Sequence, residues 1–194
     1  EKYFSKKINI GRKSFKITGI AKGSGMIYPK MATMLSFIAT DINITKRLLK
    51  KVLRDALEKS FNSITVDGET STNDSFLIIS TGKSSIPKIL SSDSKEYNLF
   101  YNAMEAVCID LAKKIIKDGE GATKFIEINI LNAKNIKQAK NLGFSIANSP
   151  LVKTAMFASD PNLGRILSAI GSSKEEINLK KLSLSINGIL VFDN

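Results

Sequence analysis

Thr33 stands out among the residues that could do chemistry, because it lies where a glycine-punctuated loop enters an apolar run. The loop is broken by Gly23, Gly25 and Pro29, and the run Ala-Thr-Met-Leu (32–35) follows. A junction of this kind can hold one hydroxyl in an unusual position. The residues alone leave two interpretations open: a nucleophile or an ordinary strand threonine.

The absence of histidine restricts the chemistry that is available. The 194 residues contain no histidine and one cysteine, Cys108, so Ser-His-Asp and Cys-His catalysis cannot be assembled within this chain. A zinc site built from Cys and His is excluded for the same reason. A single cysteine cannot form an internal disulfide, which fits a reducing compartment. The helical, apolar surroundings of Cys108 predict a buried core thiol.

The net charge of +11 raises the question of nucleic-acid binding. Only four of the 29 basic residues are arginine, the side chain preferred for bidentate contacts to phosphates and bases. The lysines are scattered, and only residues 2–16 form a basic cluster. We therefore expect no nucleic-acid partner. No apolar run approaches the roughly 18–20 residues of a membrane span, so we expect no membrane partner either.

Glu120 and Arg165 are the other charged residues that we weighed as site candidates. Glu120 lies in a turn, Asp118–Gly121, that is too short and too poor in acidic residues for a calcium-binding EF-hand loop. Spacing alone favours a solvated carboxylate there. Arg165, near the start of a predicted helix, could bind an anion, but a surface role is favoured. The glycines before Thr33 match neither a Walker loop nor a dinucleotide-binding fingerprint.

The elements that must position these residues follow from hydrophobic periodicity and turn residues. Asp160 as N-cap with Pro161 at the first helical position predicts one helix start, and Asn187-Gly188 predicts a hairpin turn. The expected strands are 14–20, 33–40, 63–67, 75–81 and 124–131, and the expected helices are 45–61, 95–117, 134–147 and 160–171. Helices alternate with strands, so the class is mixed α and β.

Four segments together resemble one enzyme family. The run KGSGMIYPKMATMLSFIATD (22–41) is similar to the cleavage-site signature of the ornithine acetyltransferases, also called bifunctional glutamate N-acetyltransferases of arginine biosynthesis. Three further segments agree, in family order: VDGETSTND (66–74), DGEGATKF (118–125) and NSPLVKTAMFASDPNLGRIL (148–167). None is a common turn or helix pattern, so their combination is specific, and the resemblance covers nearly the whole chain.

The resemblance implies an autoprocessed enzyme of the N-terminal-nucleophile type, with layered β-sheets flanked by helices in an α/β (mixed α+β) fold. The precursor would cut itself at the Ala32-Thr33 bond, and Thr33 would then be the catalytic nucleophile. Residues 1–32 would be the C-terminal end of an α-chain, and residues 33–194 a β-chain that lacks its C-terminal end. A freed α-amine, with a reference pKa of about 7.7–8.0, can act as base for its own hydroxyl.

The same resemblance implies the reaction and its contacts. Thr33 would take acetyl from N2-acetylornithine and pass it to L-glutamate. The family's substrate-binding lysine falls on Lys22, whose cation suits an α-carboxylate, and its substrate-binding glutamate falls on Glu120, which suits an ammonium group. No cofactor and no metal are expected, and the use of acetyl-CoA as a second donor is left open. Members usually assemble as two α and two β chains, and a cytoplasmic location is expected.

The chain departs from the family pattern at three positions. Tyr28 and Lys30 stand where histidine and asparagine are common, and Leu163 replaces a usual tryptophan, so fine specificity does not carry over. The resemblance also implies that an oxyanion Thr-Gly pair and a C-terminal Asn with a Thr or Ser lie outside these residues. Three alternatives stay open: an N-terminal-nucleophile amidohydrolase or aminopeptidase, a non-catalytic truncated product, and a basic nucleic-acid binder.

Overall fold

The structure is a computed structural model that describes residues 1–28, 34–71, 73 and 75–193. The chain divides into two compact units, Glu1–Ala122 and Thr123–Asn194. Each has its own apolar core. This boundary between compact units is a different matter from the expected division into an α-chain and a β-chain at Ala32-Thr33. That division concerns covalent cleavage and stays a prediction.

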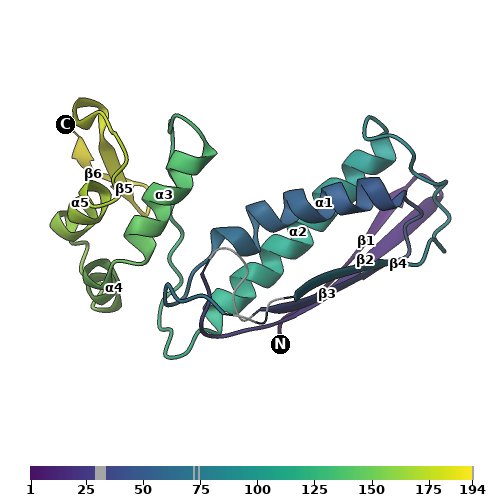
Figure 1. Cartoon of the computed structure of the whole chain (residues 1–194), viewed down its shortest axis with the longest axis horizontal. Helices are drawn as coiled ribbons and strands as arrows, with labels where there is room; N and C mark the ends of the chain where they lie inside the picture. The colour runs from purple at the N-terminus through teal and green to yellow at the C-terminus, as the bar shows by residue number, and fades with distance from the viewer. Residues whose placement is uncertain (29–33, 72, 74, 194) are drawn as a thin grey trace. The chain divides into compact units, whose positions relative to one another are not determined.

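A four-stranded sheet forms the base of the first unit (Figure 1). Its strand order is β1-β2-β3-β4, with antiparallel pairing except between β3 and β4, which run parallel. Alternating burial explains the strands, since Phe15 and Ile17 point into the core while their neighbours do not. The strands are β1 Tyr3–Ile10, β2 Lys13–Lys22, β3 Leu35–Thr40 and β4 Ser75–Ser80.

Two helices cover one face of this sheet, α1 (Lys46–Lys59) and α2 (Lys95–Lys117) (Figure 1). Each begins at a hydroxyl N-cap, Thr45 and Ser94, whose side chain accepts a backbone hydrogen bond from the first turn. Gly19 permits the close approach of α2 to the sheet. A Cβ at that position would lie 2.8 Å from Leu111 Cδ1.

The packed interface includes Cys108, which is fully buried. Burial raises the pKa of this thiol to about 12. The prediction of a buried core thiol is therefore confirmed, and an unreactive side chain results because the thiolate is the reactive form.

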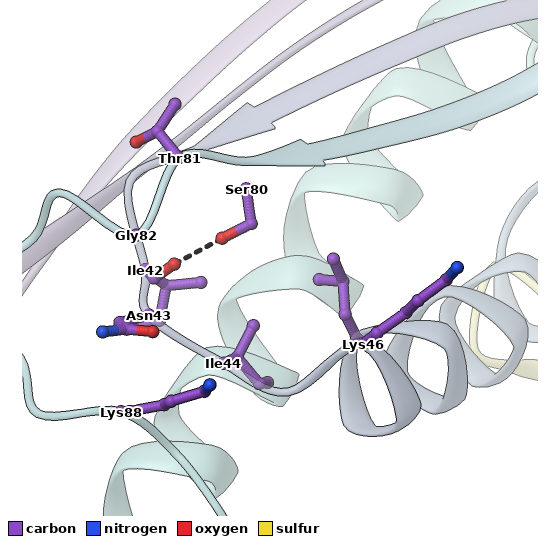
Figure 2. A pocket seen from close by; sticks show the side chains of 9 residues that line it. Ile42, Asn43, Ile44, Lys46, Ser80, Thr81, Gly82 and Lys88 are labelled. Atoms are coloured by element: carbon purple, nitrogen blue, oxygen red, sulfur yellow. Dashed lines mark hydrogen bonds between the residues drawn. The ribbon is translucent and has the colours of Figure 1, made fainter.

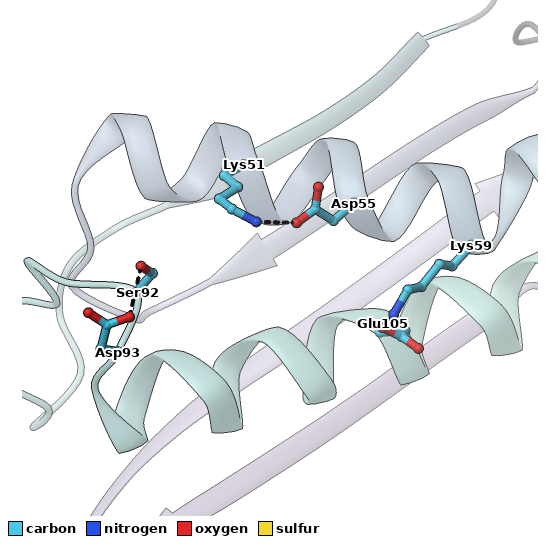
Figure 3. A network of polar contacts seen from close by, with 6 residues as sticks. All are labelled: Lys51, Asp55, Lys59, Ser92, Asp93 and Glu105. Atoms are coloured by element: carbon cyan, nitrogen blue, oxygen red, sulfur yellow. Dashed lines mark hydrogen bonds and ion pairs between the residues drawn. The ribbon is translucent and has the colours of Figure 1, made fainter. Parts of the chain in front are cut away.

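Ion pairs lie on the outer side of the two helices (Figure 3). Lys51 and Asp55 pair within α1 at 2.6 Å, and Lys59 of α1 reaches Glu105 of α2 at 2.8 Å. The hydrogen bond to Glu105 is the main cause of the raised pKa of Lys59. These pairs are largely exposed, so solvent screens them and the helix contact depends on apolar burial instead.

The opposite face of the sheet carries a row of exposed apolar side chains. Tyr3, Ile20, Phe37 and Leu77 face one another across the four strands. Each is between 43% and 51% exposed. The described residues of the first unit leave each of these side chains about half exposed, and we call the four the open sheet row.

The second unit is a small helical cluster with a hairpin. Its core includes Leu142, Ile146, Val152 and Ile166. The hairpin turns at Asn187 and Gly188, whose φ angles of 50° and 81° fit the predicted Asn-Gly turn. The elements are α3 Ile136–Ala147, α4 Pro150–Phe157, α5 Leu163–Gly171, η2 Leu179–Lys181, β5 Ser183–Ile186 and β6 Ile189–Asp193.

The mixed α+β class is confirmed, but several predicted elements are wrong. Residues 63–67 are not a strand: the short helix η1 (Phe61–Ser63) precedes a turn in which Thr65 and Asp67 side chains accept backbone hydrogen bonds. Residues 124–131 are not a strand either and join neither described sheet. The alternation of apolar and polar residues in this segment still reflects packing, since Ile128 and Ile130 contact the core of the second unit.

Two elements that were not predicted and one helix N-cap also differ from the sequence prediction. The basic segment 1–13 contains β1, which its alternating apolar residues could have predicted. Helix α4 was not predicted. Helix α5 is capped by Asn162, not Asp160, because the Asn162 side chain accepts from Arg165 N–H while Asp160 accepts from the Asn162 amide.

Candidate active site

Three of the four motif segments meet at the end of β2. The loop that follows Lys22 is bonded to the 66–74 segment, because Val66 N–H donates to Ile27 C=O at 2.9 Å. It is also bonded to the 118–125 segment, because Glu120 N–H donates to Ser24 C=O at 3.3 Å. Segments that lie far apart in the sequence therefore build one site.

The Asp67 carboxylate is the principal anchor of this loop. Its Oδ2 accepts from Met26 N–H at 2.6 Å, and its Oδ1 accepts from Ile27 N–H at 3.1 Å. The same Oδ1 accepts from Glu69 N–H at 3.1 Å, which closes a tight turn in its own segment. One side chain thus fixes two neighbouring segments.

A cavity of about 430 Å³ opens beside the anchored loop. Lys22 enters it from the last position of β2, where its Cα pairs with that of Leu35, two residues after Thr33 in the sequence. Glu120 enters it from the turn after α2. The lining consists of Lys2, Lys22, Gly23, Ser24, Gly25, Met26, Asp67 and Glu120.

Charges of both signs line the cavity. Two carboxylates approach Gly25, because a Cβ at that residue would lie 3.6 Å from both Asp67 Oδ2 and Glu120 Oε1. Lys2 forms an ion pair with Asp118, and this hydrogen bond lowers the pKa of the Asp118 carboxyl. A cavity with separate cationic and anionic groups can orient a zwitterionic or amino-acid ligand.

The structure thus brings together two of the predicted site residues, Lys22 and Glu120. Ala32 and Thr33 lie outside the described residues. Sequence reasoning missed Asp67 and Lys2 as lining residues. Asp67 could have been predicted, because an Asp-Gly pair in a segment rich in turn-forming residues indicates hydrogen bonds from the backbone to the Asp side chain. Lys2 gave no such signal.

The fourth motif segment belongs to the second unit. Arg165 Nη1 donates to Leu151 C=O at 3.0 Å and to Thr154 Oγ1 at 2.9 Å. These bonds tie α5 to α4. Arg165 is therefore partly buried and bonded within its unit, whereas the sequence favoured a surface role.

A second cavity, of about 330 Å³, lies at the opposite end of β3 (Figure 2). Lys46 and Lys88 contribute to it, and Ser80 donates a hydrogen bond to Ile42 C=O at its wall. It contains no residue of the four motif segments and no carboxylate. It therefore lacks a partner for a ligand ammonium group, and we assign the site to the first cavity.

The described residues offer neither a metal-binding cluster nor a membrane-spanning helix. No cluster of three or more His, Cys, Asp or Glu side chains in those residues could hold a metal ion. None of their helices combines the length and the apolar character that spanning a membrane needs.

Comparison with known proteins places the chain in a family. A family model, that of the ArgJ family, matches residues 1–194. The chain belongs to the ArgJ family. It is 50% identical, over 98% of its length, to the "Arginine biosynthesis bifunctional protein ArgJ" of Colwellia psychrerythraea (strain 34H / ATCC BAA-681). The match covers 46% of that ArgJ protein, so the chain spans about half the length of this curated relative.

A solved ArgJ structure has a similar fold. It is the crystal structure of arginine biosynthesis bifunctional protein argJ from Bacillus halodurans, with a TM-score of 0.79 and 41% sequence identity. The similarity covers 83% of this chain and 75% of the crystallised chain. The family resemblance that the four motif segments carry is therefore confirmed, at the level of the ArgJ family.

Proposed function

We propose that this chain carries the nucleophile and part of the substrate site of a self-cleaving acetyltransferase of arginine biosynthesis. The enzyme transfers acetyl from N2-acetylornithine to L-glutamate. Family membership supports the pathway, because the curated relative is named for arginine biosynthesis. The observation that carries the proposal is the cavity in which Lys22 and Glu120 meet beside the loop that leads toward Thr33.

Self-cleavage comes first in the proposed sequence of steps. The Thr33 hydroxyl attacks the carbonyl carbon of Ala32, and the acyl group moves from the Thr33 nitrogen to its oxygen. Water then hydrolyses this ester, which leaves a carboxylate on Ala32 and a free α-amine on Thr33. The freed amine has a reference pKa of about 7.7–8.0 and can take the proton of its own hydroxyl near neutral pH.

Acetyl transfer then runs in two halves. Thr33 Oγ attacks the acetyl carbonyl of N-acetylornithine, the C–N bond breaks, and ornithine leaves with a proton on its amine. The amine of glutamate attacks the acetyl-threonine ester and releases N-acetylglutamate, while the hydroxyl regains its proton. Both halves use one nucleophile, so two-step kinetics with a covalent intermediate are expected.

The cavity supplies orientation for these steps. The Lys22 ammonium pairs with the α-carboxylate shared by ornithine and glutamate. Glu120 pairs with the ammonium group of the ornithine moiety. Opposite charges at two points fix the direction of an amino acid and place its acyl group toward the nucleophile.

The wider proposal includes an α2β2 assembly, a cytoplasmic location and no resident cofactor. Residues 17–22 of β2 pair with residues 35–40 of β3. Cleavage at Ala32-Thr33 would place these two paired strands in different chains. The hydrogen-bonded ladder then supports continued association of the cleaved chains.

Mass spectrometry of the complete protein tests the proposal. The wild type is expected as two chains, one of which begins at Thr33, and Thr33→Ala as one uncut chain. Incubation of the wild type with N-acetylornithine should add about 42 Da, one acetyl group less the hydrogen that it replaces, to the chain that begins at Thr33. Glutamate should remove it as N-acetylglutamate. Release of free acetate in its place would indicate an amidohydrolase.

A further inference from the structure

The loop before the expected cleavage bond is held in a strained backbone conformation. Met26 has φ of 51°, in the left-handed region that residues other than glycine rarely adopt. Its side chain is half exposed, so apolar packing of the side chain does not explain the conformation. Backbone conformations of this kind persist where the surroundings hold them.

Asp67 supplies the contacts that hold this conformation. The shortest bond of its carboxylate goes to the N–H of Met26 itself, at 2.6 Å. The next residue is held twice, because Ile27 N–H donates to Asp67 and Ile27 C=O accepts from Val66. Ile27 is 3% exposed and belongs to the main core, which gives the loop a fixed end.

The segment beyond the expected cleavage bond is fixed as well. Met34 is 2% exposed, and its C=O accepts from Ser75 N–H at 3.0 Å. Both flanks of the Ala32-Thr33 bond are therefore tied to the core and to the chain between Val66 and Ser75. The upstream contacts combine the Asp67 side chain with one backbone bond, from Val66 N–H to Ile27 C=O, whereas the downstream bond is between backbone groups alone.

A carboxylate at position 67 accepts the hydrogen bonds of this loop better than an amide would. Three N–H groups, from Met26, Ile27 and Glu69, converge on the two Asp67 oxygens. An ionised carboxylate accepts at both oxygens, whereas an asparagine amide offers one acceptor and presents N–H to the remaining donors. Replacing Asp67 with asparagine should therefore break at least one bond without a change in size.

We infer that Asp67 is a positioning residue for self-cleavage. It acts through the backbone of Met26 and Ile27, which begins the segment that leads to the expected cleavage bond, and so influences the rate at which that bond is cut. The inference rests on the proposed function, because it assumes that the Ala32-Thr33 bond is cut. It assigns a role to a residue that need not touch substrate.

The test measures the rate of self-cleavage in newly synthesised complete protein. Wild type and Asp67→Asn are produced by cell-free translation, and the uncut fraction is followed by gel and intact mass over time. We expect Asp67→Asn to slow cleavage by about 10- to 100-fold, the range that a small misplacement of reacting groups causes. Glu69→Gln is the matched control, because it removes one negative charge from the same turn and leaves the Asp67 contacts in place.

A stability control separates positioning from general destabilisation. Val52→Ala shortens a fully buried side chain of α1, outside the site, and lowers the melting temperature without touching the Asp67 turn. If it slows cleavage as much as Asp67→Asn at a matched loss in melting temperature, the inference fails. Cleavage of Asp67→Asn at the wild-type rate would also overturn it. If wild type and Thr33→Ala both stay uncut, the proposed function fails first and the inference with it.

Discussion

Lys22 is the residue that links the described cavity most directly to substrate recognition. It is the last residue of β2, so the strand fixes its backbone while its ammonium group reaches the cavity. A lysine is a compact charge that can pair with a carboxylate without the fixed fork geometry of arginine. Its proposed role therefore depends on charge more than on shape.

We predict that Lys22→Gln raises the KM for N-acetylornithine by about 10- to 100-fold, because a hydrogen bond to a charged group contributes about 1.5–3 kcal/mol. The extent of self-cleavage should stay at the wild-type level, since no α-carboxylate takes part in that step. Steady-state kinetics of the complete protein provide the measurement. Lys88→Gln, in the second cavity, is the control and should leave KM unchanged. An unchanged KM in Lys22→Gln would contradict the assigned contact.

At the scale of the element, periodicity predicted the long helices α1 and α2 well, because their apolar faces extend over several turns. The expected helix 95–117 coincides with α2, where Phe100, Val107 and Leu111 are buried. Short segments were less predictable. Residues 63–67 contain Ile64 and Val66, but local bonds from the Thr65 and Asp67 side chains give a turn.

Site residues that belong to a family motif could be predicted from the sequence. A residue that acts by accepting hydrogen bonds from distant backbone groups could not. Lys22 and Glu120 followed from the family resemblance, and the fold brings both to one cavity. The role of Asp67 depends on three N–H groups that come from two separate segments. Only the folded chain shows that convergence, because spacing in one sequence carries no information on contacts across 40 residues.

The N-cap of α2 gives a prediction at this scale. The Ser94 hydroxyl accepts from Tyr97 N–H at 3.2 Å, and α2 is the helix that packs on the sheet and on α1. Ser94→Ala should lower the free energy of unfolding by about 0.5–2 kcal/mol, the usual cost of losing a hydroxyl cap. Urea denaturation of the complete protein measures it. Ser92→Ala is the control, because that hydroxyl donates to the neighbouring Asp93 carboxylate and does not cap α2 (Figure 3). Equal losses in both variants would contradict the capping role.

At the scale of the whole molecule, the first unit covers one face of its sheet with its own helices and leaves the other face partly exposed. The helices α1 and α2 bury one side, whereas the open sheet row leaves four large apolar side chains about half exposed on the other. A contiguous apolar patch of this kind usually marks a surface that another element covers. The curated ArgJ relative has about twice the length of this chain, because the match covers 46% of it. We expect sequence from that remaining half to cover the row.

Phe37→Thr tests this expectation, because the substitution should be beneficial in the 194-residue chain alone and destabilising in the complete protein. In the 194-residue chain alone, Phe37 is 43% exposed, so the substitution should lower the binding of a hydrophobic dye and reduce self-association. In the complete protein, the same substitution should remove buried apolar contacts and lower the free energy of unfolding by about 2–4 kcal/mol. Leu90→Thr, an exposed apolar residue outside the row, is the control and should change stability little in either form. Dye fluorescence, light scattering and urea denaturation measure these effects. If Phe37→Thr leaves the stability of the complete protein unchanged, the open sheet row is not covered there and the expectation fails.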